Sequence, residues 1–171
     1  MAFNRNFTKP LHSYLQLMKI YRFTKSQLLP ISIDTAWDFL SDSKNLKKIT
    51  PDYMGFNIIE KEDTKMYAGQ IIQYIVTPIL GIPTKWVTEI THVKDKSYFV
   101  DEQRFGPYSL WHHKHFIKEV DGGVEMLDII DYKIPLGLIG RIANPILVKP
   151  KLNEIFDYRK QKLIDLFGEF K

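Results

Sequence analysis

The sequence predicts an α+β fold in which a curved antiparallel sheet of about seven strands wraps around a long C-terminal helix. Residues 55–135 contain six segments with the alternation of apolar and polar residues that is typical of strands. After Pro135 the period changes, and apolar residues recur at helical spacing as far as residue 168. One further strand and two short helices are predicted ahead of the six strands, which gives the element order β-α-α-β6-α.

The length and composition indicate one domain preceded by a short extension. The chain has 171 residues, of which 44% are hydrophobic and 26% are charged, and this is enough to bury one sizeable core. Strand-like alternation begins only at Met18, so we expect an N-terminal extension over residues 1–17 and a domain over residues 18–171. Met18 can be the true start of translation. An ordered helix over residues 10–17 is an alternative that the sequence leaves open.

A strand and two short helices are predicted at the start of the domain. Residues 18–29 alternate as a strand, and Ser32 is suited to cap a helix over residues 33–40, because its side-chain oxygen can accept a free N–H of the first turn. Ser43 can cap a second short helix. This helix must end before Pro51, because the residue ahead of a proline avoids the helical region.

The six remaining strands and the last helix follow from alternation, turn residues and helical period. The strands are predicted at residues 55–61, 69–77, 84–94, 97–104, 108–120 and 123–134, and Asp121-Gly122-Gly123 is a strong hairpin signal. The helix is predicted over residues 138–168, with a bend or interruption at Pro145 and Pro150. We expect its apolar stripe to face the sheet; the stripe consists of Ile142, Ile146, Leu152, Ile155 and Phe156.

Composition excludes several classes of function. There is no cysteine, so a disulfide framework, thiol catalysis and thiolate zinc sites are excluded. No apolar run is long enough to span a membrane. The net charge of +4 comes from residues 1–33, which hold five basic residues and no acidic one, so the rest of the chain is nearly neutral and we expect no nucleic-acid binding. The start of the chain lacks the pattern of a secretory signal, and we expect a cytoplasmic protein.

Strand parity predicts which residues of the last hairpin face the core. If Gly122-Gly123 forms the turn, His115 lies beside Ile130, His113 beside Tyr132 and Trp111 beside Ile134. The outer face then carries His112, Lys114, Lys118, Glu125, Asp131 and Lys133. The inner wall carries Trp111, His113, His115, Ile117, Val124, Met126, Asp128, Ile130, Tyr132 and Ile134, and neighbouring strands add Phe99, Asp101, Gln103, Trp86, Thr88 and Ile90.

The predicted inner wall carries carboxylates and imidazoles among apolar residues. An ionised carboxylate on such a wall costs several kcal/mol unless it is paired or hydrated, so Asp101 and Asp128 need partners. A hydrated cavity in which Asp128 orients His115 or reaches His113 supplies them, and such contacts shift histidine pKa values. A purely structural polar network is an alternative. A cation shared by the two imidazoles and Asp128 is another, although we expect neither a metal nor any other cofactor.

Several short motifs resemble the START-like superfamily, also called SRPBCC, whose fold is the helix-grip. The resemblance covers residues 19–168. It rests on Asn45-Leu46, Ile49-Thr50-Pro51, Gly81-Ile82-Pro83, Trp86, Phe99-Val100-Asp101-Glu102-Gln103, Gly106-Pro107-Tyr108, Trp111-His112-His113-Lys114-His115, Asp128, Tyr132 and Pro135, which are similar to an uncharacterised bacterial ligand-binding subgroup. The resemblance implies a curved sheet around a terminal helix with a ligand cavity between them. It does not select among binding, transport and catalysis, because superfamily members do all three.

Three functions fit this sequence. The leading hypothesis is binding of a small hydrophobic molecule between the sheet and the C-terminal helix, by Trp86, Asp101, Gln103, Trp111, His113, His115, Asp128 and Tyr132. The second is a cyclase-like or hydrolase-like enzyme that uses a histidine–aspartate pair of the cavity as general acid or base. The third is an accessory module that docks on a membrane or a partner protein through its basic N-terminal arm or the apolar segment 78–83.

Overall fold

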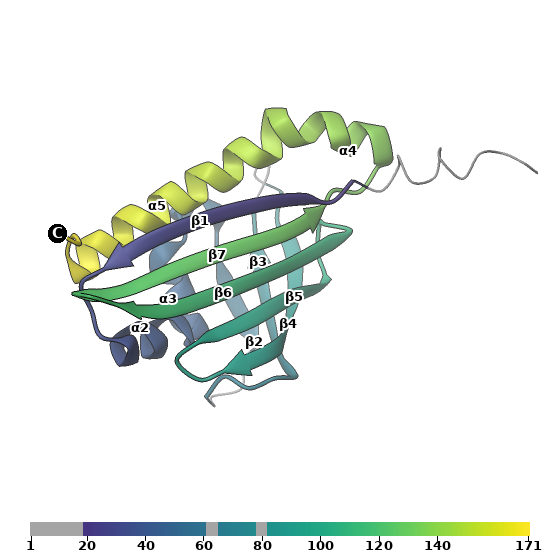
Figure 1. The fold of residues 1–171 in the computed structure, drawn as a ribbon. Coiled ribbons are helices and arrows are strands. Elements are labelled where there is room, and N and C mark those ends of the chain that lie inside the picture. Colours follow the sequence, from purple (N-terminus) through teal and green to yellow (C-terminus); the bar gives the residue numbers. More distant parts are fainter. Residues whose placement is uncertain (1–18, 61–64, 78–81) are drawn as a thin grey trace, which may run out of the picture.

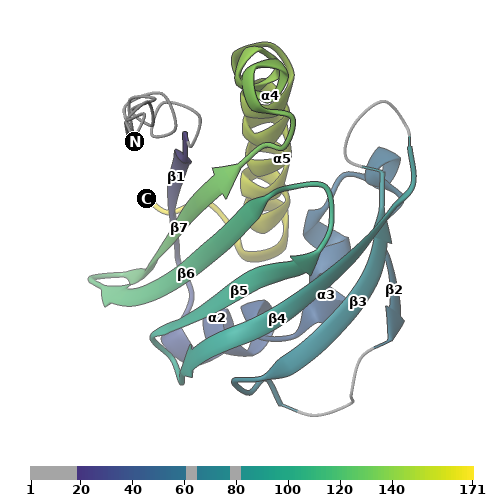
Figure 2. The ribbon, with the colours of Figure 1, turned by 90° about the vertical axis from the view of Figure 1, so that its right-hand side faces the viewer.

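The computed structural model describes residues 19–60, 65–77 and 82–171, and it shows seven antiparallel strands in one curved sheet (Figure 1). The strands are β1 (Tyr21–Leu29), β2 (Asn57–Glu60), β3 (Gln70–Val76), β4 (Thr84–Lys94), β5 (Tyr98–Phe105), β6 (Leu110–Val120) and β7 (Gly123–Lys133), in the spatial order β1-β7-β6-β5-β4-β3-β2. The helices lie on one side of the sheet, with the long C-terminal helix running along the β1 edge (Figures 1 and 2). The predicted α+β helix-grip class is confirmed.

The two short helices after β1 begin at polar caps. Helix α2 (Ile33–Leu40) is capped by Ser32, whose hydroxyl accepts the Thr35 N–H at 3.2 Å, as predicted. Helix α3 (Ser43–Leu46) is capped by Asp42, one residue before the predicted cap, because the Asp42 carboxylate accepts the Lys44 N–H at 3.0 Å. A 3₁₀ turn continues the helix through Ile49, ahead of Pro51.

The register of the last hairpin differs from the predicted one by two residues. Val120 pairs with Gly123, so Asp121 and Gly122 alone form the turn, and Gly122 takes the positive φ of 81°. Gly123 is the first residue of β7. A side chain would not fit there, because a Cβ would lie 2.0 Å from the carbonyl oxygen of Leu29, at the end of β1. The shift is even, so every side chain keeps its predicted face, but Asp128 now lies directly opposite His115.

The C-terminal helix has three parts: α4 (Gly137–Ala143), the π-helical segment η3 (Asn144–Val148) and α5 (Lys149–Phe167). Pro145 lies in the π-helical segment and Pro150 in the first turn of α5, so the predicted interruption is confirmed. The predicted inward stripe is correct for Leu152 and Phe156, which are buried, and for Ile155, which is partly buried and lines the pocket. It is wrong for Ile142 and Ile146, which are 64% and 73% exposed.

Gly140, Asn144 and Val148 occupy the buried positions of α4 and η3 instead. A Cβ at Gly140 would lie 2.2 Å from the Pro135 carbonyl oxygen, so the helix packs there at a distance that only glycine allows. Asn144 Oδ1 accepts a hydrogen bond of 2.7 Å from the Tyr132 hydroxyl on β7. Gly140 and Asn144 therefore determine which face of the helix packs on the sheet, and Ile142 and Ile146 lie on the exposed face.

The hydrophobic core lies between the inner face of the sheet and the helices. One cluster joins α2, β6, β7 and α5 around Trp37 and Leu163, a second joins β1 and β7 to α5 around Phe156, and a third lies around Trp86 on β4. In the part of the chain that the structure describes, no helix has the length and apolar character that a membrane span requires. The expected extension over residues 1–17 and most of the segment 78–83 lie outside the described residues.

Candidate functional site

A pocket of about 190 Å³ lies between the inner face of the sheet and α5. Its volume is far above the ~10–15 Å³ that a single water needs, so it can hold a small molecule. Most of its lining is apolar or aromatic. These residues include Leu46, Met54, Phe56, Ile72, Tyr74, Val76, Trp86, Ile90, Phe99, Tyr108, Trp111, Met126, Leu152, Ile155 and Phe156.

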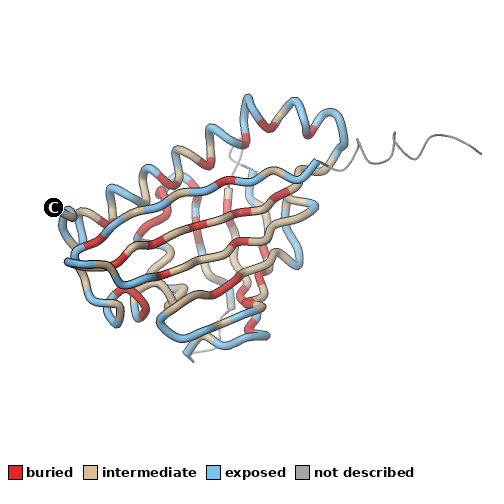
Figure 3. The backbone as a smooth tube through the Cα atoms, viewed as in Figure 1, coloured by how far each residue is buried: buried red, intermediate tan, exposed pale blue. Residues whose placement is uncertain are grey.

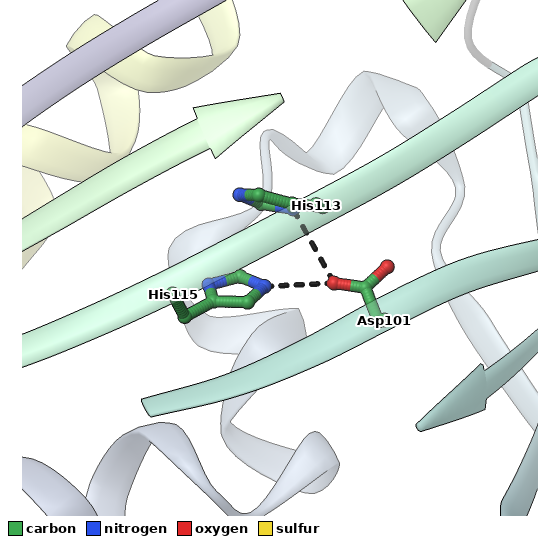
Figure 4. Close-up of side chains that lie close together, drawn as sticks. All are labelled: Asp101, His113 and His115. Carbon is green, nitrogen blue, oxygen red and sulfur yellow. Dashed lines mark hydrogen bonds and ion pairs between the residues drawn. The ribbon is translucent and has the colours of Figure 1, made fainter. Parts of the chain in front are cut away.

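Two histidines and two aspartates form a closed cluster on the wall of this pocket. His113 and His115 occupy successive inward positions of β6, with ring centroids 3.7 Å apart. Asp128 Oδ1 lies 2.9 Å from both His113 Nε2 and His115 Nδ1. Asp101 Oδ2 lies 2.7 Å from His115 Nε2 and 3.4 Å from His113 Nδ1 (Figure 4). Each imidazole therefore lies between two carboxylates.

The sheet register creates this cluster. Asp101 on β5 pairs with His113, and Asp128 on β7 pairs with His115, so each carboxylate is directly opposite one imidazole and diagonal to the other. Phe99 pairs with His115 and stacks on its ring with centroids 4.1 Å apart. The prediction that Asp128 contacts His115 and His113 is confirmed in geometry, and Asp101 does the same from the other side.

Burial and pairing shift the pKa values of the cluster in opposite directions. Burial and the nearby charge of His115 hold the pKa of His113 below its ordinary value. Burial also lowers the pKa of His115, but its hydrogen bonds to Asp101 and Asp128 outweigh this and raise the pKa overall. Burial alone would raise the pKa of each aspartate, yet contacts with the two histidines hold both values below the ordinary range.

A buried guanidinium completes the charge balance. Arg159 on α5 lines the pocket near both aspartates, whose charges partly offset the lowering of its pKa by burial. The raised pKa of His115 and the lowered pKa of His113 favour a charged His115 beside a neutral His113. In that state His115 and Arg159 balance the two carboxylates, and the cluster carries no formal net charge. A neutral cluster is the arrangement that an apolar wall tolerates best.

Among the described residues, three buried polar groups on the lining of this pocket have no hydrogen-bond partner. They are the Ser43 hydroxyl, which can donate or accept, and two N–H donors, Trp86 Nε1 and Arg159 Nε. Buried N–H groups normally find partners, since an unmade hydrogen bond costs about 1–3 kcal/mol. An acceptor oxygen held in the pocket is one way to satisfy such a donor.

Six of the eight predicted site residues line the pocket, and two do not. Those that line it are Trp86, Asp101, Trp111, His113, His115 and Asp128. Gln103 instead closes the turn between β5 and β6, where its amide donates to the Tyr108 carbonyl at 2.6 Å and accepts the Tyr108 N–H at 3.1 Å. Tyr132 is buried against Tyr21 and donates to Asn144, so it anchors the C-terminal helix.

Arg159 was missed as a site residue, although the sequence held a signal for it. Leu152, Phe156, Arg159 and Leu163 recur at the spacing of one helix face. A guanidinium inside such an apolar stripe needs a buried counter-charge. The Phe156 ring lies 4.6 Å below the Arg159 guanidinium and holds it over the pocket wall.

Three residues of the cluster lie close enough together to bind one cation. Asp101, His113 and His115 each offer one ligand atom, and these atoms lie within 4.8 Å of one another, a nitrogen and oxygen set that zinc accepts. Asp101 therefore takes the place in this group that the sequence suggested for Asp128. Each of these atoms already lies within hydrogen-bond or ion-pair distance of a partner in the cluster, so we interpret the arrangement as a hydrogen-bonded network.

The fold and the site together define a helix-grip protein with a polar cluster in an apolar pocket. No family model matches the sequence, and no curated protein matches it. Solved structures with the same fold include protein CV1439 from Chromobacterium violaceum, with a TM-score of 0.65 and 9% identity over 87% of this chain and 98% of that one. Protein TTHA0849 from Thermus thermophilus matches with a TM-score of 0.61 and 10% identity over 85% of this chain and 99% of that one.

The Bet v 1-like protein Ara h 8.0201 matches with a TM-score of 0.55 and 13% identity, over 86% of this chain and 99% of that one. A nucleoside-diphosphate sugar epimerase from Corynebacterium glutamicum matches with a TM-score of 0.58 and 21% identity. The match covers 84% of this chain but only 28% of the epimerase. At these identities the structural matches establish the fold and nothing finer.

Proposed function

We propose that this chain is a START-like (SRPBCC) domain that binds a small, mainly apolar molecule in the pocket between the sheet and α5. One observation carries the proposal: an apolar pocket that holds a buried group of two histidines, two aspartates and Arg159. An ordinary core would bury apolar residues here at lower cost. The Bet v 1-like neighbours and the motif resemblance support a ligand-binding role for such a pocket.

The unpartnered donors indicate what kind of polar group the molecule carries. Trp86 Nε1 and Arg159 Nε are both donors, so they favour an acceptor oxygen such as a carbonyl or a hydroxyl. An anionic ligand is disfavoured, because it would face the carboxylates of Asp101 and Asp128 on the pocket wall. We therefore propose a neutral molecule with one or two oxygen atoms at one end of an apolar body.

The Asp128→Asn variant tests this role, with Asp131→Asn as the matched control. Both residues lie on β7 and differ by three positions, but Asp128 faces the pocket and Asp131 faces outward. Asparagine keeps an acceptor oxygen and removes the charge that balances His115. We expect Asp128→Asn to retain at least tenfold less co-purifying small molecule per folded protein, and Asp131→Asn to retain the wild-type amount.

The measurement is native mass spectrometry of the purified protein, together with its thermal melt. A lower melting temperature with unchanged ligand per folded protein would mean that the cluster is structural, and it would overturn the proposal. The proposal would also be overturned if Asp128→Asn retained the wild-type amount of ligand and the wild-type melting temperature. Loss of ligand from a cooperatively folded variant supports it.

A second function is favoured by the opposite pKa shifts of His113 and His115. A neutral histidine beside a protonated one is a base and an acid within one pocket, which is the arrangement that proton-transfer enzymes use. The same mass spectra distinguish the two functions. A binding protein releases the molecule unchanged on incubation, whereas an enzyme converts it to a product of different mass or fragmentation.

A further inference from the structure

The most exposed apolar side chains of the described chain gather at one end of the sheet. We call this the α4 end: β1, β2, β4 and β6 begin there, β3, β5 and β7 finish there, and α4 follows β7. Eight large apolar residues are at least 55% exposed, and all of them lie in segments that adjoin this end. They are Ile20, Ile82, Phe105, Leu136, Leu138, Ile139, Ile142 and Ile146.

The helical part of this surface is a stripe on the outer side of α4 and η3. Gly140, Asn144 and Val148 face the protein body, and Leu138, Ile142 and Ile146 lie two residues away, which is about 200° around a helix. Figure 3 shows this segment mainly exposed, with isolated buried points on the side toward the sheet. The close contact of Gly140 with Pro135 prevents the helix from turning its isoleucines inward.

Basic residues lie along the stripe and elsewhere at the same end of the sheet. From Lys133 to Asn153 the chain contains no acidic residue and four basic ones, of which Arg141 and Lys149 are exposed. Lys19 and Lys85 are also exposed at the same end, one residue before Ile20 and three residues after Ile82. An apolar stripe bordered by Lys and Arg is typical of helices that lie in the interface of an anionic membrane.

We propose that the α4 end docks on an anionic lipid surface, with Leu138, Ile142 and Ile146 entering the interface and the neighbouring basic residues contacting the headgroups. A lipid surface is favoured over a protein partner because the apolar side chains come from four separate segments and the segment that carries the stripe, from Lys133 to Asn153, has basic residues and no acidic one. This inference does not depend on the pocket ligand. It goes beyond a binding function, because it assigns a surface where the molecule meets a membrane.

The test is flotation of the full chain with phosphatidylcholine vesicles, with and without phosphatidylglycerol. The variant is Ile142→Ser with Ile146→Ser, and the matched control is Ile71→Ser with Leu166→Ser. The control residues are 43% and 49% exposed, and they lie at the opposite end, at the start of β3 and the end of α5. We expect the wild type and the control to bind phosphatidylglycerol vesicles, and the variant to bind at least about tenfold more weakly.

Binding should also weaken as the salt concentration is raised, because salt screens the attraction between the basic residues and the anionic headgroups. Absence of binding to phosphatidylglycerol vesicles, or equal binding by the variant and the wild type, would overturn the proposal. If the wild type is a dimer and the variant is a monomer, the stripe binds a second copy of the chain, and the proposal is overturned. A melting temperature lowered by the variant alone would assign the stripe to packing within this chain, with the same consequence.

Discussion

The two faces of strands β5, β6 and β7 carry similar charged residues at alternate positions, yet only one face is a candidate site. On the inner face, Asp101, His113, His115 and Asp128 contact one another and are buried or nearly so. On the outer face, Lys114 and Arg22 both bind Asp131, with their nitrogens 2.8 Å and 2.7 Å from its oxygens. Glu102 Oε1 likewise lies 2.9 Å from His112 Nδ1.

The difference between the faces shows that burial, and not residue type, gives these pairs their properties. His112 and His113 are neighbours in sequence, and each lies 2.9 Å from a carboxylate oxygen. On the outer face, both members of a pair keep partial contact with solvent, so the pair adds little to stability. On the inner face, the loss of one member leaves a charge that water cannot reach, and the cost is several times larger.

Replacing each of these two histidines by alanine should give the largest contrast. His113→Ala removes a buried hydrogen-bond partner of Asp128 and leaves a cavity, so we expect a loss of about 3–5 kcal/mol in the free energy of unfolding. His112→Ala should cost no more than ~1 kcal/mol. Urea denaturation followed by tryptophan fluorescence measures both values. Equal losses in the two variants would mean that the inner cluster is hydrated and behaves as a surface pair.

The pH dependence of stability sharpens the comparison within the inner face. The pKa of His115 is raised above 6.5, so its contribution to stability is present below about pH 6.5 and is lost as the pH rises through its folded pKa. The pKa of His113 is lowered, so its contribution is present above about pH 6.5 and is lost as the pH falls through its folded pKa.

The His115→Gln variant isolates the first of these contributions. Its loss of stability relative to the wild type should be larger near about pH 6 than near about pH 9, because protonated His115 is what the two aspartates stabilise. Denaturation at both pH values gives the difference, and an NMR titration of the wild type should show His115 titrating above His113. The reverse order of the two titrations would contradict the proposed protonation states.

The sequence was sufficient for the faces of the strands but not for their register. Side chains alternate with a period of two, so the burial of Asp128 and His113 followed from parity even though the predicted register was shifted by two residues. The register depended on which residues of Asp121-Gly122-Gly123 make the turn. In the structure the Leu29 carbonyl lies so close to Gly123 that no Cβ would fit there, and no local pattern records this contact between distant parts of the chain.

The same limit applies to the C-terminal helix. Its extent and its interruption followed from apolar spacing and from Pro145 and Pro150. The inward face of α4 did not, because it is marked by Gly140 and Asn144, which bury little apolar surface. Their positions are set by contact with Pro135 and Tyr132, so a count of apolar residues selected Ile142 and Ile146 instead.

We expect the smallest change in stability from the Arg22→Ala variant, which removes an ion pair of the outer face. The hydrogen bond and charge of Arg22, with a smaller contribution from Lys114, hold the pKa of Asp131 at about 2. Without Arg22 that pKa should rise toward its ordinary value of 3.8, which an NMR titration of the Asp131 carboxyl would detect. The melting temperature should change by no more than about 3 °C, because both partners of this pair are accessible to solvent.

The change should shrink further in high salt, which screens surface pairs but not buried ones. A large, salt-independent loss of stability would mean that the outer pairs form a buried network like the inner one, and the contrast between the two faces would then have to be explained by something other than burial.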